Sequence, residues 1–164
     1  MPERETIERA REDAREGKSP STQAGEFVRE EIHHIREGKH GARSTQQAIA
    51  IGLSKARRAG VKLKPPKKGT TSEATRRAAV RDSRKAKSGG RKKTSVRRSR
   101  AILKRLKREG RSAASPQALA RHARSAARRR SAASRSASAK KAVRTKGPAK
   151  RRAAAKKAAR TRAR

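Results

Sequence analysis

The sequence predicts a mostly α-helical protein in which a small N-terminal helical module precedes a largely disordered, partly helical polycationic tail. Two observations lead to this prediction. Apolar residues within positions 1–60 recur at helical spacing between glycine stops. The charge is also divided unequally, because residues 1–60 hold 12 Lys and Arg against 10 Asp and Glu, whereas residues 61–164 hold 39 against three. The second part therefore carries +36 of the formal net charge of +38.

The apolar content limits where a core can form. Leu, Ile, Val and Phe number 17 of 164 residues, well below the ~20% under which a highly charged chain tends toward disorder. Only seven of these residues lie in 65–164. We therefore predict a folded module at 1–64, a basic linker with short helices at 65–133, and a disordered tail rich in Ala, Lys and Arg at 134–164.

Three helices are predicted in the module. A leading helix at 2–16 has interleaved acids and bases and ends at a glycine. A second helix at 21–37 carries one apolar stripe, and a third at 43–60 begins at Ser44 or Thr45 and ends at a glycine. The last two helices form a hairpin. The stripe of the second helix consists of Ala24, Phe27, Val28, Ile32 and Ile35.

The third helix is the densest apolar segment, and its spacing predicts how it packs. Ile49 and Leu53 lie four residues apart and share one face, which we expect to contact the stripe of the second helix. Ile51 points to another side of the helix. We therefore expect Ile51 to contact a further helix or a second copy of the chain.

After the module, prolines and glycines divide the chain. The proline pair at 65–66 predicts an extended basic segment around it, because proline excludes helix there. A capping box opens a predicted helix at 70–87, and shorter helices are expected at 95–109 and 116–130. Within 134–164, clustered like charges are expected to suppress helix despite the many alanines, until phosphates neutralise them.

Several classes of function find no support in the residues. Without cysteine the chain has no disulfide, thiolate metal site or cysteine nucleophile, and no nucleophile or phosphate-loop motif occurs. His33, His34 and His40 lack an obvious fourth ligand, and adjacent histidines on a helix point to different faces. We therefore expect no enzyme activity, no catalytic residue, no cofactor, no metal and no small-molecule substrate. Without an apolar signal or spanning segment, we expect a cytoplasmic protein that does not associate with membranes.

The polycationic tail predicts binding to nucleic acid, chiefly duplex DNA, because a concentrated polyanion relieves its self-repulsion. Lys and Arg contact phosphates without reading bases, and a single Phe with no Trp or Tyr leaves no stacking platform. We therefore expect binding without strong sequence specificity. The predicted nucleic-acid-binding residues are Lys39, Arg43, Lys55, Arg57, Arg58, Lys62, Lys64, Lys67, Lys68, Lys92, Lys93, Arg97, Arg98, Lys104, Arg105, Arg128, Arg129, Arg130, Lys140, Lys141, Lys150, Arg151, Arg152, Lys156 and Lys157.

The loop at 39–45 is a second candidate for phosphate binding. A glycine between Lys39 and Arg43, followed by a helix N-terminus, suits a phosphate held by backbone N–H groups. The alternative is an ordinary interhelical turn with a serine cap.

Two stretches resemble known groups of proteins. Residues 43–60, RSTQQAIAIGLSKARRAG, preceded by 30–41, EEIHHIREGKHG, resemble a signature of small, basic, largely uncharacterised bacterial proteins that are labelled DNA-binding or plasmid-stabilisation proteins. The tail around 147–159 is similar to linker-histone C-terminal tails and to bacterial histone-like proteins built on them. Together the resemblances imply a histone-like, nucleoid-associated DNA-binding protein.

Two other functions remain open at this point. The near-neutral module with its apolar stripe also suits plasmid stabilisation, protein interaction or homo-oligomer formation, with the tail as a DNA anchor. Charge alone does not distinguish DNA from RNA, so an RNA- or ribosome-associated protein is the other alternative.

Overall fold

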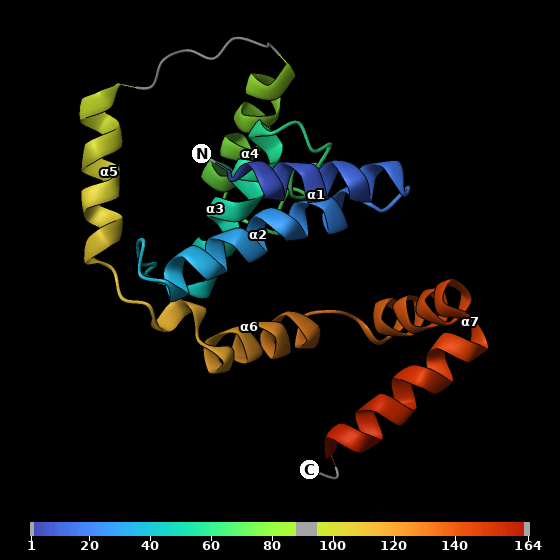
Figure 1. The fold of residues 1–164 in the computed structure, drawn as a ribbon. Helices are drawn as coiled ribbons and strands as arrows, with labels where there is room; N and C mark the ends of the chain where they lie inside the picture. The colour runs from blue at the N-terminus through green and yellow to red at the C-terminus, as the bar shows by residue number, and fades with distance from the viewer. Residues whose placement is uncertain (1, 88–94, 163–164) are drawn as a thin grey trace. The chain divides into compact units, whose positions relative to one another are not determined.

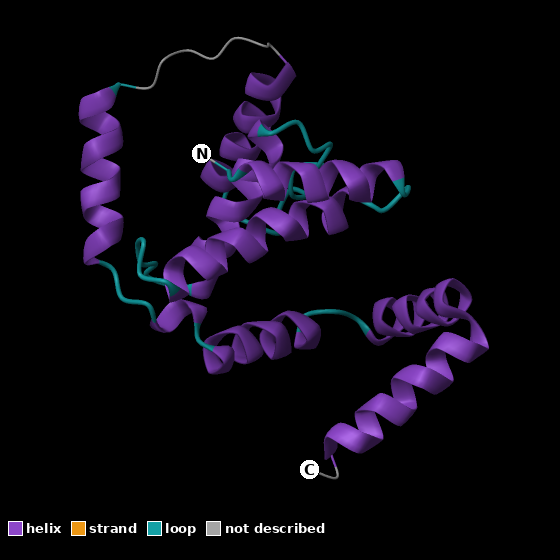
Figure 2. Cartoon of the chain, viewed as in Figure 1, coloured by secondary structure: helices purple, strands orange, loops and turns teal. Residues whose placement is uncertain are grey.

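The computed structural model describes residues 2–87 and 95–162, and within these residues the chain consists of helices and loops without a strand (Figure 2). The predicted helical class is therefore confirmed. Contacts divide the chain into two compact units, Met1–Ala120 and Arg121–Arg164. The elements along the chain, labelled in Figure 1, are α1 (Arg4–Arg15), α2 (Pro20–Arg36), α3 (Thr45–Arg58), α4 (Glu73–Lys87), α5 (Val96–Arg108), the short 3₁₀ helix η1 (Ser112–Ala114), α6 (Pro116–Arg128) and α7 (Ala132–Arg162).

Local signals explain where the first helices begin and end. The Ser19 hydroxyl accepts the Thr22 N–H at 3.4 Å and caps α2, with Pro20 at the first helical position. The Ser44 hydroxyl accepts the Gln47 N–H at 3.1 Å and caps α3. Glycines with positive φ follow each of the three helices, which is the backbone conformation that ends a helix. The three helices of the predicted module are thus confirmed, with ends that differ by a few residues.

The unit that ends at Ala120 has two groups of buried apolar residues, and both join α2 to α3. The first group lies around Phe27, and Leu53 of α3 packs against it together with Val61 and Leu63 from the stretch after that helix. The second lies around Ile32 and Ile35. It also contains Ala113 and Ala114, which lie in the stretch predicted as linker. The compact unit therefore extends far beyond the predicted module end at residue 64.

The segment 106–114 closes the end of the α2–α3 hairpin through the backbone. Gly41 N–H donates to the Leu106 carbonyl at 2.9 Å, and Ala42 N–H donates to the Gly110 carbonyl at 3.1 Å. The buried Thr45 hydroxyl donates to the Ala113 carbonyl at 2.8 Å. These bonds satisfy backbone groups that burial would otherwise leave without partners. Closure therefore combines small apolar residues with a set of backbone hydrogen bonds.

The face of α3 that lies closest to α2 is made of small residues. Ala48, Gly52 and Ala56 are buried there, whereas Ile49 is only partly buried. A Cβ on Gly52 would lie 2.7 Å from Val28 Cα and 3.0 Å from the Phe27 carbonyl oxygen. The helices approach so closely that only glycine fits. The expected packing of Leu53 on α2 is present, but the buried stripe is rotated from Ile49 toward the small residues.

Helix α4 packs on α3. The Ser54 hydroxyl donates to Asp82 Oδ2 of α4 at 2.6 Å. Ile51 lies three residues before Ser54 and therefore on the same side of α3, which is the side on which the sequence analysis expected a further helix. Ala79 is the buried residue of α4.

The disorder predicted for 134–164 is wrong for the described residues, because α7 runs through Ala132–Arg162. A break occurs at Gly147, with φ 65° and ψ 170°, just before Pro148. Alanine has the highest helix propensity, and Lys and Arg rank close behind it. That preference outweighs the charge repulsion on which the prediction relied. Within the described residues, no helix combines the length and apolar character needed to cross a bilayer.

Substituting Gly52 tests the close approach of α2 and α3. We expect Gly52→Ala to lower the free energy of unfolding, because overpacking against backbone costs about 1–3 kcal/mol and exceeds the gain of about 1 kcal/mol in helix propensity. Urea unfolding followed by circular dichroism measures the change. The matched control is Gly25→Ala in α2, where an added Cβ meets no atom within 4 Å. That variant should be as stable as the parent protein or more so, and equal responses at the two sites would contradict the packing.

Candidate nucleic-acid interface

The cations of this chain fall into two groups. Those of the first group form ion pairs with acids, and those of the second group do not depend on such pairs. Within the first three helices, acids engage many of the cations. Arg9 Nε lies 3.0 Å from Glu26 Oε2, and Lys18 Nζ lies 2.7 Å from Asp13 Oδ1. Such cations already have an anionic partner. The second group is exposed and lies largely outside these helices.

Lys55 belongs to the first group, although the sequence analysis placed it in the binding surface. Its ammonium lies 2.7 Å from Glu31 Oε2 and 3.0 Å from Glu30 Oε1, and only 13% of its side chain is exposed. Burial works to lower the pKa of Lys55, but the two carboxylates raise it overall. In the same way, burial opposes the shift at Glu30, yet the hydrogen bond from Lys55 helps to lower the pKa of that carboxyl. Lys55 therefore links α3 to α2 in the interior.

Arg57 is also withdrawn from the surface. Its side chain is buried at the junction of α3 and α4, where Nε has no hydrogen-bond partner. Burial lowers the pKa of Arg57, while the nearby Asp82 works in the opposite direction. Arg58, the next residue, is exposed, and its Nε donates to the Ser54 carbonyl at 3.3 Å. Arg57 therefore belongs to the interior, and Arg58 belongs to the surface.

The loop at 39–45 uses its donors within the protein. As described above, the Gly41 and Ala42 N–H groups bind the segment 106–114. The Arg43 N–H donates to Gln47 Oε1 at 3.1 Å. Lys39 Nζ lies 3.1 Å from Glu37 Oε2 and 3.3 Å from Glu3 Oε1, and these contacts raise the pKa of Lys39. The loop is therefore an interhelical turn with a serine cap, and of its two predicted cations Arg43 is exposed while acids contact Lys39.

The other predicted cations that the structure describes are exposed. They form a basic stretch after α3, the polar part of α5, and the second unit. Lys92 and Lys93 lie outside the described residues. The exposed residues are Arg43, Arg58, Lys62, Lys64, Lys67, Lys68, Arg97, Arg98, Lys104, Arg105, Arg128, Arg129, Arg130, Lys140, Lys141, Lys150, Arg151, Arg152, Lys156 and Lys157.

The structure adds a set of arginines that the sequence analysis missed. Arg76, Arg77, Arg81 and Arg84 line a shallow hollow on α4 around Val80. Arg76 and Arg77 both lie near Glu73, at 2.6 and 3.6 Å, so Arg81 and Arg84 are the members of the set that extend beyond that acid along the helix. The sequence does carry a signal for this set. Arg81 lies four residues after Arg77, and Arg84 lies eight residues after Arg76, and residues at these spacings share one face of a helix.

Comparison with known proteins bears on the hairpin alone. Residues 17–68 match the model of a family of unknown function, DUF6496. This stretch contains α2, α3 and the basic residues that follow them, about a third of the chain. No curated protein and no solved structure matches the chain. The similarity therefore marks the hairpin and leaves the cationic second unit outside the matched part.

A matched pair of substitutions separates the two groups of cations. Lys55→Met should lower the free energy of unfolding by about 3–5 kcal/mol, because it leaves buried carboxylates without their cation. Lys62→Met, at an exposed position, should change stability by no more than about 0.5 kcal/mol and should instead reduce the salt dependence of duplex binding. Urea unfolding and fluorescence anisotropy measure the two effects. If both variants had the same stability, the interior role of Lys55 would be wrong.

Proposed function

We propose that this protein binds nucleic acid, chiefly duplex DNA, through phosphate contacts and without strong sequence specificity, as histone-like, nucleoid-associated proteins do. The cations that bind phosphates in this proposal are Arg43, Arg58, the exposed cations after α3, the α4 arginines, and the cations of α5 and of the second unit. Residues 39 and 55 are left out because acids hold both, and residue 57 is left out because it is buried. In this proposal the protein works in the cytoplasm, on the nucleoid.

One observation carries the proposal, the absence of any acid in the second unit. Residues 121–164 contain 18 Lys and Arg and no Asp or Glu, and the described side chains of the cations are exposed. No side-chain carboxylate of this unit balances them. Neutralising phosphates with these cations would release counterions, which supplies affinity that falls steeply with salt.

The same residues argue against sequence readout. The exposed set consists of Lys and Arg, which position a protein on the phosphate backbone. The only aromatic residue, Phe27, is buried in the core, so it offers no face to a base. The unit 1–120 in this proposal supplies a folded anchor for the tail. The alternative, a protein-interaction or plasmid-stabilisation module, differs in requiring a protein partner for that unit.

Removing the second unit tests the proposal directly. A chain that ends at Ala120 should bind a random duplex much more weakly at physiological salt. Its plot of log affinity against log salt should be less steep by about 0.9 for each phosphate that the protein no longer neutralises. The matched control keeps the full length but replaces the cations at 128–130, 140–141, 150–152 and 156–157 with Gln, which has similar helix propensity. Both variants should bind more weakly and with a shallower slope. Wild-type affinity in either one would contradict the proposal.

Comparison of unrelated duplexes tests specificity. Affinities for several sequences of equal length should agree within a few-fold, because the cations bind the phosphate backbone. A sequence bound about 1000-fold more tightly, in the range of specific readers, would contradict it.

The choice between DNA and RNA is tested by treating native complexes with DNase or RNase. Release by DNase supports the proposal, and release by RNase alone contradicts it.

A further inference from the structure

A second cluster of side chains, remote from the cationic tail, has the composition of a metal site. Glu31 and His34 lie three residues apart on α2, on one face of the helix. His40 joins them from the loop that follows the helix. One ligand atom from each of the three residues lies within 4.8 Å of the others. Only the loop conformation brings them together, which is why the sequence analysis did not find this set.

The carboxylate of Glu31 is unusual because it is fully buried, and neither oxygen has a partner with hydrogen-bond geometry. Its Oε2 is nevertheless 2.7 Å from Lys55 Nζ, an ion pair. Its Oε1 lies 3.3 Å from His40 Nε2. One oxygen is therefore balanced by a cation, and the other faces an imidazole.

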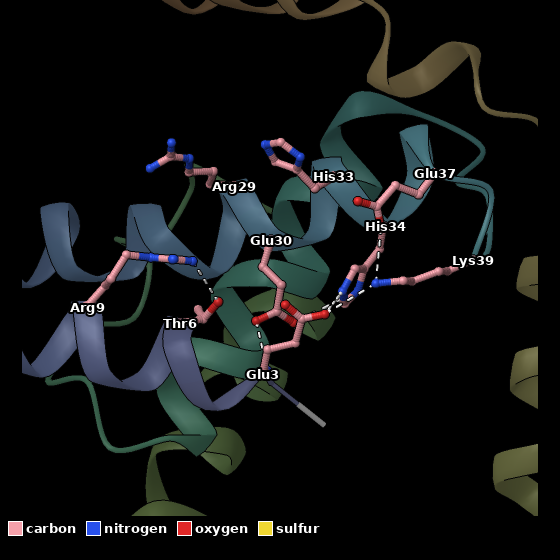
Figure 3. A pocket seen from close by; sticks show the side chains of 9 residues that line it. All are labelled: Glu3, Thr6, Arg9, Arg29, Glu30, His33, His34, Glu37 and Lys39. Carbon is pink, nitrogen blue, oxygen red and sulfur yellow. Dashed lines mark hydrogen bonds and ion pairs between the residues drawn. The ribbon is translucent and has the colours of Figure 1, made fainter.

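The hydrogen bonds of the histidines determine which nitrogen is available. His40 Nδ1 lies 3.1 Å from the Gly41 carbonyl, which only accepts, so Nδ1 carries the proton. His40 Nε2 then presents a lone pair toward the Glu31 oxygen. His34 Nε2 lies 2.7 Å from Glu3 Oε1 (Figure 3), and His34 Nδ1 lies 3.9 Å from Glu30 Oε1. Because Nε2 is held by the nearer carboxylate, Nδ1 is the nitrogen that His34 offers to an ion.

Two lone pairs that face each other at 3.3 Å repel unless a proton on the imidazole or a metal cation lies between them. Charge counting points the same way, because Glu3, Glu30 and Glu31 surround the cluster while Lys39 and Lys55 supply two positive charges. The three acids exceed these two cations by one charge, and Glu37 shares Lys39 and adds to the excess of negative charge. His33, by contrast, points away from His34 and Glu3 in Figure 3.

We infer that Glu31, His34 and His40 bind a divalent first-row transition-metal ion of the zinc type. Two imidazoles and one carboxylate are a known ligand set for Zn²⁺, with a water in the fourth position. Tetrahedral ligands at about 2.0–2.1 Å from zinc are separated by about 3.3 Å, which is the present distance between Glu31 Oε1 and His40 Nε2. One ring nitrogen of His34 lies within 4.8 Å of the ligand atoms of the other two residues. Glu3 is the outer carboxylate that orients it.

The bound ion would connect the 39–42 loop to α2. That loop donates the backbone hydrogen bonds that the segment 106–114 accepts, so the ion would hold the loop in the shape that closure requires. The site therefore has a structural role, independent of the proposed binding to nucleic acid.

Zinc titration of the full-length protein tests the inference. The protein is freed of nucleic acid and treated with EDTA, then titrated with ZnCl₂ by calorimetry in phosphate-free buffer. We expect one Zn²⁺ per chain and a higher unfolding temperature when it is bound. His40→Gln and His34→Gln should weaken binding by at least about 100-fold, because removal of even an outer partner costs about 10–100-fold. Glu3→Gln should cost about 10-fold.

The matched control is His33→Gln, which removes an exposed histidine next to His34. It should bind Zn²⁺ as the wild-type protein does. Co²⁺ gives a readout that needs no variant, since four-coordinate Co²⁺ absorbs visible light far more strongly than the hexaaqua ion. Equally weakened binding in His33→Gln and His40→Gln, or a Co²⁺ spectrum of six-coordinate type, would overturn the inference. So would wild-type affinity no higher than that of the His34, His40 double variant.

Discussion

The ion pair of Lys55 with two carboxylates of α2 is the interaction on which the rest of the folded unit depends. Glu30 and Glu31 are buried, and buried charges are tolerated only when paired and hydrogen-bonded. The Glu3 N–H also donates to Glu30 Oε2 at 3.1 Å, so the same cluster fixes the start of α1. Three helices therefore meet at one group of charges. The packing at Gly52, on the same two helices, requires that they stay at this separation.

Pairing of charges also explains where the proposed binding residues lie. Acids are frequent in the first 37 residues and hold nearby Lys and Arg in ion pairs. After Glu109 the chain has no acid, so its cations have no competing side-chain carboxylate. A duplex would meet the cations of the second unit without competition from an acid in that unit, which favours its phosphates. The positions of the thirteen acids thus determine which cations are available to phosphates in this proposal, more than the positions of the cations do.

The parts of this structure that could be predicted from the sequence are the local ones. Ser19, Ser44 and the glycine stops act on their own helices, so the limits of α1 to α3 follow from short-range chemistry. Burial of Ala113 and Ala114 could not be predicted, because two alanines carry no periodic signal and their partners lie more than 60 residues away. Lys55 resembles any cation near a helix end until Glu30 and Glu31 are placed beside it. For α7, propensity and repulsion oppose each other, and the sequence does not show which dominates.

The helical state of the second unit changes the thermodynamics expected for binding. A disordered segment that folds on its partner loses conformational entropy at that moment, which weakens the affinity. In α7 the backbone is already ordered on both sides of the break at Gly147, and each half is roughly 20 Å long at the rise of an α-helix. Each half carries cations on all sides, with no acid to orient one face. Such rods would contact phosphates from many directions with little ordering cost, so affinity would follow counterion release rather than coupled folding.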